Sequence, residues 1–180
     1  VYLNVYAATF DVAFRIRPLS VGHVDIQIGD TIYAFGRYGE TWGILDMKGM
    51  GILKVGDAAS MMQAQSESNN KKVIRAKLSM SHEQVNQLKE NLNDIIKNNS
   101  KYESTDTLPQ YDYYRLTNDY DLFSNNCTTF AMNLLYDIYG DEMGGMQDAW
   151  APYQVYRYLM SDKRPSFVEF IYPTYDSYIE

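Results

Sequence analysis

The chain has 180 residues and a mass of 20.8 kDa, which suits a single domain over residues 1–180 with a sizeable core. Apolar residues make up 46% of it, but no apolar run approaches the length of a membrane span, so no transmembrane segment is expected. The net charge of −7, without a stripe of lysine and arginine, argues against nucleic acid as a partner, and a lone cysteine cannot form an internal disulfide.

Strand patterns dominate the amino-terminal half of the chain. Segments rich in β-branched and aromatic residues predict strands at residues 1–6, 9–17, 42–47 and 73–78. Residues 50–55 lie among glycines and predict either a short strand or a mobile loop, and the polar residues 66–72 predict a solvated loop.

A β-hairpin is predicted between the strand at residues 9–17 and the strand at residues 42–47. Residues 22–28 alternate strictly between polar and apolar side chains, which is typical of a half-buried strand. Residues 31–35 form the returning strand after a two-residue turn. This register would place Gly36 opposite His23.

One amphipathic helix is predicted over residues 82–98. Ser81 and Gln84 form a capping box at its start, and apolar residues recur at helical spacing along it. His82 then lies in the solvated first turn, which makes it a poor catalytic candidate.

The last third of the chain predicts two further helices and a strand. Apolar residues recur at helical spacing after Cys127, and Gly140 is a suitable end for that helix. A short helix over residues 152–160 and a strand over 167–172 follow.

Cys127 stands at the start of its helix, because Asn125 or Asn126 is a suitable N-cap. Backbone N–H groups and the positive end of the helix dipole stabilise a thiolate there, so a lowered thiol pKa is expected. The alternative is that Cys127 is a small apolar core residue, a common role for a free cysteine. A partner base would favour the catalytic interpretation.

His23 is the candidate base. It occupies the first polar position of the predicted strand, where it is either a surface residue or the base that a reactive thiol needs near neutral pH. No third residue that would orient it stands out. Ala34, opposite Asp25 in the predicted register, has no suitable side chain, and Arg37, which a bulge could bring closer, has no acceptor. Asp25 itself, Tyr38 and a backbone carbonyl stay open.

These residues resemble a known family. Gly22-His23 on a strand and Asn126-Cys127-Thr128-Thr129-Phe130 at a helix start are similar to the circularly permuted branch of the NlpC/P60 papain-like superfamily, which includes lecithin:retinol-acyltransferase-like enzymes. Residues 33–39 further resemble permuted NlpC/P60 toxin domains of Rhs-type and type VI secretion effectors. The resemblance covers roughly residues 20–140. It implies an α+β fold, in which an antiparallel sheet packs against the nucleophile helix, with Cys127 as nucleophile and His23 as base.

The same resemblance implies an antibacterial effector toxin that is a thiol hydrolase or acyltransferase and needs no cofactor. Permuted members act mostly on lipid esters, so we expect a phospholipase A-like reaction through an acyl-enzyme on Cys127. A peptidoglycan amidase or endopeptidase is the alternative, and a non-enzymatic binding module is a third possibility. Such effectors are secreted into the periplasm or membrane of a target cell, and a cognate immunity protein is the expected partner. No signal peptide is expected from the sequence.

Two features bear on ligands. Met47, Met50, Met61 and Met62 follow the hairpin closely, and they would provide either an adaptable lip for acyl chains or a protein, or ordinary core packing. Two separated histidines and one cysteine are too few ligands for zinc, so no metal site is expected.

Overall fold

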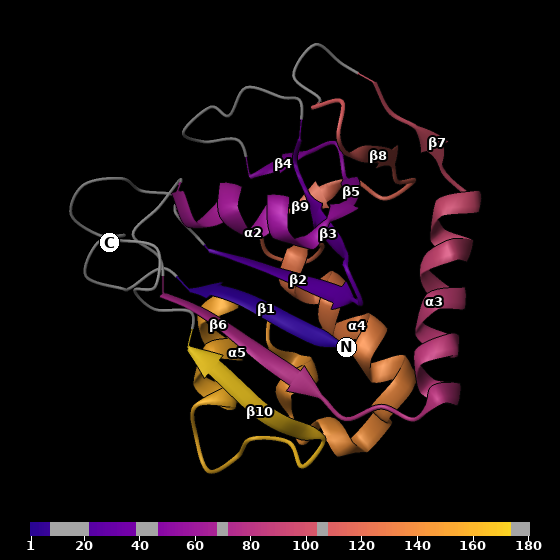
Figure 1. Ribbon diagram of the computed structural model, residues 1–180. Helices are drawn as coiled ribbons and strands as arrows, with labels where there is room; N and C mark the ends of the chain where they lie inside the picture. The colour runs from indigo at the N-terminus through magenta and orange to yellow at the C-terminus, as the bar shows by residue number, and fades with distance from the viewer. Residues whose placement is uncertain (8–21, 39–46, 68–71, 104–107, 174–180) are drawn as a thin grey trace, which may run out of the picture.

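The computed structural model describes residues 1–7, 22–38, 47–67, 72–103 and 108–173 (Figure 1). The strand predicted over residues 9–17 lies outside these ranges, as does nearly all of the strand predicted over 42–47. The described strands are β1 (Tyr2–Ala7), β2 (His23–Ile28), β3 (Thr31–Gly36), β4 (Lys48–Gly49), β5 (Ile52–Asp57), β6 (Lys72–Leu78), β7 (Ser100–Lys101), β8 (Asp112–Arg115), β9 (Tyr120–Asp121) and β10 (Val168–Pro173). The described helices are α2 (Ala58–Glu67), α3 (His82–Lys97), α4 (Cys127–Tyr139) and α5 (Pro152–Leu159), with 3₁₀ turns at Gly140–Met143 and Met146–Asp148.

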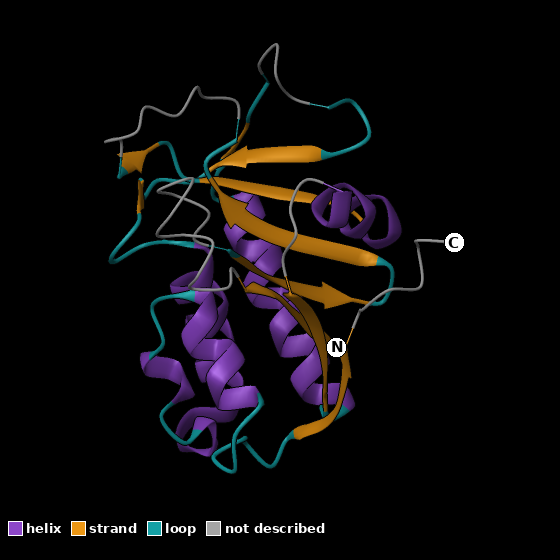
Figure 2. Ribbon diagram, turned by 90° about the vertical axis from the view of Figure 1, so that its left-hand side faces the viewer, coloured by secondary structure: helices purple, strands orange, loops and turns teal. Residues whose placement is uncertain are grey.

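The protein is a mixed α+β structure built on a large antiparallel sheet, as the sequence predicts at this coarse level. Within the described residues the sheet has eight strands in the order β10-β6-β1-β2-β3-β5-β8-β7, and β4 and β9 form a separate pair. Figures 1 and 2 show α2 on one side of the sheet and α4 and α5 on the other.

The larger core lies between the sheet and helices α3, α4 and α5. Val24 and Ile26 of β2 point into it, because alternate residues of a strand face the same side, and Leu135 of α4 packs with them. Nearby, the Phe130 ring of α4 stacks on Phe35 of β3, with ring centroids 5.1 Å apart. These contacts fix the position of α4 against the centre of the sheet.

A second, smaller core covers the opposite face of the sheet. Met61 of α2 and the rings of Tyr111 and Tyr113 pack there against Ile32. The polar side chains of β2 on this side are buried too, and Asp25 is only 3% exposed. The sequence pattern had predicted a half-buried strand. That prediction is wrong, because a strand pattern cannot show which segment packs over its polar face.

The helix boundaries agree well with the sequence where local signals are strong. Ser81 and Gln84 form the predicted capping box at the start of α3, and α4 ends at Gly140 as predicted. The sequence does not predict helix α2, whose last two residues fall in the segment 66–72 where a solvated loop is predicted. The start of α2 carries one usable signal, since Asp57 accepts a 2.8 Å hydrogen bond from the Ser60 N–H.

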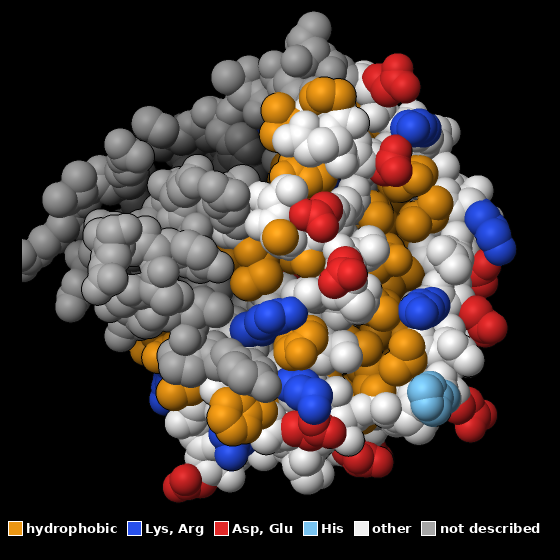
Figure 3. All heavy atoms as spheres, viewed as in Figure 1, with side chains coloured by type: hydrophobic (Ala, Val, Ile, Leu, Met, Phe, Trp, Pro, Cys, Tyr) orange, Lys and Arg blue, Asp and Glu red, His pale blue; other side chains and the backbone are white. Residues whose placement is uncertain are grey.

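The surface seen in Figure 3 carries charged side chains of both signs close together. Two ion pairs illustrate this: Lys77 with Glu169, and Lys101 with Asp112. Exposed pairs of this kind contribute little to stability.

None of the helices in the described ranges is long and apolar enough to cross a membrane.

Candidate functional site

Asn126 fixes the start of α4. Its side-chain oxygen accepts hydrogen bonds from the N–H groups of Thr128 and Thr129, at 2.8 and 3.1 Å, and the Thr129 hydroxyl accepts from the Asn126 N–H. The Asn126 amide nitrogen donates to the carbonyls of Leu122 and Trp150, at 2.7 and 2.9 Å. One buried amide therefore joins the start of α4 to the segments on either side of it, and it leaves the N–H of Cys127 outside the cap.

Asn126→Ala should lower the free energy of unfolding by about 2–4 kcal/mol, because a helix cap and two buried amide hydrogen bonds are lost together. Urea unfolding followed by circular dichroism measures this. Asn125→Ala is the matched control, since the Asn125 amide makes one exposed hydrogen bond, to the Asp119 carbonyl. Equal losses in the two variants would contradict the assignment of Asn126 as the cap that organises the site.

Strands β2 and β3 separate just where Cys127 approaches them. Their pairing runs from Ile28↔Thr31 to Ile26↔Tyr33 and ends there, although both strands continue. The predicted register is right for these pairs, but the predicted pairing of Gly36 with His23 and of Ala34 with Asp25 is absent. In an antiparallel pair every second residue bonds to the same neighbour, so the Val24 N–H points toward β3. It donates instead to the Cys127 sulfur.

Burial raises the pKa of the Cys127 thiol, and this overturns the expectation of a lowered one. The side chain is 5% exposed, and loss of solvent outweighs the hydrogen bonds from Val24 and Thr128, which act in the opposite direction. The negative charge of Asp25 raises the pKa further. The resting cysteine is therefore a protonated thiol, and a base must remove its proton before or during attack.

His23 is the first residue of β2, directly before the residue whose N–H bonds the thiol. Its ring lies beside the Tyr6 ring, with centroids 6.0 Å apart. Gly22 precedes it with φ +80°, and a Cβ there would collide with the Tyr6 carbonyl and touch Pro152. Glycine at position 22 therefore allows the chain to pack closely on Pro152, the first residue of α5, just before β2 begins. His82, by contrast, is exposed at the start of α3, as predicted.

An apolar pocket of about 200 Å³ opens next to Cys127. Its lining residues are Tyr120, Leu122, Phe123, Asn126, Cys127, Trp150, Ala151 and Pro152. The polar atoms of Asn126 are already engaged in the cap, so the pocket offers mainly apolar surface to a ligand. Phe123 and Trp150 are 57% and 46% exposed, and their ring centroids lie 6.2 Å apart. They form an aromatic rim that the sequence does not predict, since Phe123 and Trp150 come together only through the fold.

The proposed methionine lip is largely wrong. Met61 is 2% exposed in the smaller core, and Met50 and Met62 are partly buried against the same core. Only Met47 is well exposed, and its carbonyl accepts a hydrogen bond from the N–H of Leu122, a pocket residue. The methionines mostly pack, as the alternative interpretation held.

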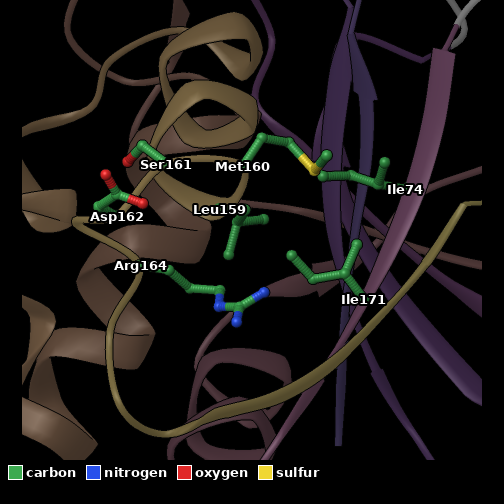
Figure 4. Close-up of a pocket in the computed structure, with 7 residues that line it drawn as sticks. All are labelled: Ile74, Leu159, Met160, Ser161, Asp162, Arg164 and Ile171. Atoms are coloured by element: carbon green, nitrogen blue, oxygen red, sulfur yellow. The ribbon is translucent and has the colours of Figure 1, made fainter.

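The larger cavity of about 330 Å³ contains neither Cys127 nor His23 (Figure 4). It lies between the end of α5, β6 and β10 and is lined by Ile74, Leu159, Met160, Ser161, Asp162, Arg164 and Ile171. Its charged members are exposed, which is typical of a shallow surface groove.

Over the ranges that the structure describes, no group of three or more His, Cys, Asp or Glu side chains could hold a metal ion.

Comparison of the chain with protein-family models, curated proteins and solved structures finds no match. Any function proposed for this chain therefore rests on the geometry of the site. A buried thiol at a capped helix start, a histidine at the first residue of the adjoining strand and an apolar pocket are suited to nucleophilic attack by sulfur on a carbonyl carbon.

Proposed function

We propose that this chain is the catalytic domain of an antibacterial effector and that it cleaves phospholipid esters with a cysteine nucleophile. The proposed architecture is the permuted NlpC/P60 papain-like fold, as one domain over residues 1–180. The observation that carries the proposal is the position of Cys127, whose sulfur bonds the N–H of Val24, the residue after His23, and which lines an apolar pocket. The pocket supports a lipid substrate, because apolar walls bind an acyl chain better than a glycan or a peptide.

In this proposal His23 acts as general base and Cys127 as nucleophile. His23 takes the thiol proton while the sulfur attacks the ester carbonyl, and the Cys127 N–H donates to the developing oxyanion. The tetrahedral intermediate collapses to a thioester on Cys127, and His23 returns the proton to the departing lysophospholipid alcohol. Water, activated by His23, then releases the fatty acid; another acyl acceptor would make the reaction a transfer. Because the thiol pKa is raised, proton removal is part of the attack.

The substrate class is tested by incubating the protein separately with vesicles of bacterial phospholipids and with purified peptidoglycan. We expect free fatty acid and lysophospholipid from the vesicles and no soluble muropeptides. Trp150→Ala should lower the rate on long-chain lipid more than the rate on a short-chain ester, since Trp150 lines the pocket. Muropeptide release with intact lipid would instead establish the peptidoglycan amidase.

A non-enzymatic binding module is the second candidate, and the burial of Cys127 favours it. Expression with export to the periplasm separates the two functions. An enzyme should be toxic there, and Cys127→Ala should remove the toxicity. Toxicity that survives this substitution would support the binding module, and harmless expression would contradict the effector proposal.

We further propose that a cognate immunity protein covers the mouth of the pocket. The exposed rings of Phe123, Trp150 and Tyr153 suit the anchor positions of a protein interface, since buried aromatic residues commonly dominate such interfaces. The net charge of −7 would speed association with a basic partner. Co-expression with the neighbouring gene should restore growth if that gene encodes this partner.

A further inference from the structure

The pocket beside Cys127 has two walls that come from separate parts of the chain. Residues 120–123, before α4, form one wall, and residues 150–152, which lead into α5, form the other. The Asn126 side-chain amide donates a hydrogen bond to a backbone carbonyl of each wall, at 2.7 and 2.9 Å. One buried side chain therefore holds both walls beside the residue that carries the thiol, and the shape of the pocket and the position of the sulfur are fixed together.

The lining of this pocket favours a hydrocarbon chain. None of the described residues that line it carries a charge. Asn126 is buried, and both polar atoms of its side chain are already hydrogen-bonded. Tyr120 is buried as well, and its ring packs against Phe35 with centroids 5.8 Å apart. A polar group that entered would lose its water without gaining hydrogen bonds, whereas a hydrocarbon chain would gain contacts at no such cost.

The size of the pocket limits how much of a chain it can enclose. Its volume of about 200 Å³ is below the roughly 300–1,000 Å³ of pockets that enclose a drug-sized ligand. A whole membrane acyl chain does not fit in this space, so its far end must leave through the mouth. The exposed rings of Phe123 and Trp150, 6.2 Å apart, continue the apolar surface at that point. A bound chain would thus have an enclosed part near the sulfur and a second part that lies on the aromatic rim.

We propose that this pocket binds the first carbons of the acyl chain that is transferred to Cys127, and that Trp150 determines specificity for chain length. The head group of the lipid stays outside, because the pocket offers it neither charge nor free hydrogen-bonding groups. This inference rests on the proposed function, since it names the part of the lipid that the pocket takes. Its test uses thiol-directed reagents in place of lipid, so the inference and the hydrolase proposal can fail separately.

The experiment labels Cys127 with a series of n-alkyl methanethiosulfonates, from methyl to hexyl. The sulfur of Cys127 loses its proton to the solvent and attacks the alkyl-bearing sulfur of the reagent. A disulfide forms, the bond to the sulfonyl sulfur breaks, and methanesulfinate leaves with the electron pair of that bond. The alkyl chain is then attached to the sulfur where the acyl chain of a substrate would be. Because the chain has one cysteine, the mass of the intact protein reports the rate of this single reaction.

The labelling rate of the native protein should rise with chain length, by up to about fourfold for each methylene that enters the pocket. The same protein unfolded in guanidinium is the control for the reagents, and its rates should not depend on chain length. Trp150→Ala should lower the ratio of the hexyl rate to the methyl rate by about tenfold, as expected when roughly two methylenes lose their contacts. Tyr136→Ala is the matched control, because Tyr136 is an exposed aromatic residue of α4 that does not line the pocket, and its ratio should equal the native one.

Rates that do not rise with chain length in the native protein would overturn the inference, as would a native ratio in Trp150→Ala. Failure of every reagent to label Cys127 would overturn it too, since the pocket would then not lead to the sulfur. If Trp150→Ala does not fold, Phe123→Ala removes the other ring of the rim and should lower the same ratio. Labelling that rises with chain length, without release of fatty acid from vesicles, would support the inference and contradict the hydrolase proposal.

Discussion

Cys127→Ala should abolish phospholipid hydrolysis while leaving the fold nearly unchanged. The sulfur is the proposed nucleophile, and without it no thioester can form, so we expect a rate loss on the order of 10⁴-fold or more. Folding should tolerate the change because alanine fits the small buried site, and the cap at Asn126 does not involve the Cys127 side chain. Fatty acid release measures the first effect, and thermal unfolding measures the second.

Cys127→Ser is the matched variant for this experiment. Serine keeps the size and a hydrogen-bonding atom at the position of the sulfur, but it is a poorer nucleophile under the same base. We expect it to fold like the native chain and to be nearly inactive. Full activity in either variant would show that Cys127 is not the nucleophile and only packs in the core.

His23→Ala should reduce turnover by roughly 10²- to 10⁴-fold, the usual contribution of a general base. The effect should be large because the resting thiol of Cys127 is protonated, and burial makes spontaneous ionisation unfavourable. His82→Ala is the internal control. His82 is exposed in the first turn of α3, so its loss should cost little beyond a slightly weaker helix start.

Parallel turnover and unfolding measurements on the two histidine variants separate catalysis from folding. His23 lies beside the Tyr6 ring, so some loss of stability is expected in His23→Ala, but far too little to remove activity at room temperature. Equal activity of the two variants, or a larger loss in His82→Ala, would show that the permuted assignment of the base is wrong.

The sequence predicts best where the signal is local. The capping box at Ser81 and Gln84 locates α3, and an asparagine before Cys127 locates α4. Both signals rest on hydrogen bonds between residues three positions apart, so they do not depend on the rest of the fold. The hairpin register near its turn is predicted for the same reason.

The rest of the site depends on contacts between distant segments. The pairing of β2 with β3 ends at Ile26, and the Val24 N–H beyond it bonds the sulfur of Cys127, about a hundred residues downstream. Asp25 on the polar face of β2 is buried, and α2, Tyr111 and Tyr113 pack over that side of the sheet at β3 and β5. Strand alternation identifies that face as polar but cannot reveal what covers it. The sign of the shift in the thiol pKa depends in turn on the burial of Cys127 itself, which no local signal at the helix start reveals.

The most direct test of the central claim is the mass of the intact protein after brief incubation with phospholipid vesicles and acid quenching. The account predicts a fraction of protein heavier by one acyl group, with the modification mapped to Cys127 by peptide sequencing. The adduct should be sensitive to hydroxylamine, as a thioester is, and should be absent from Cys127→Ala. Release of fatty acid by Cys127→Ala at the native rate, or an acyl group on any other residue, would contradict the account.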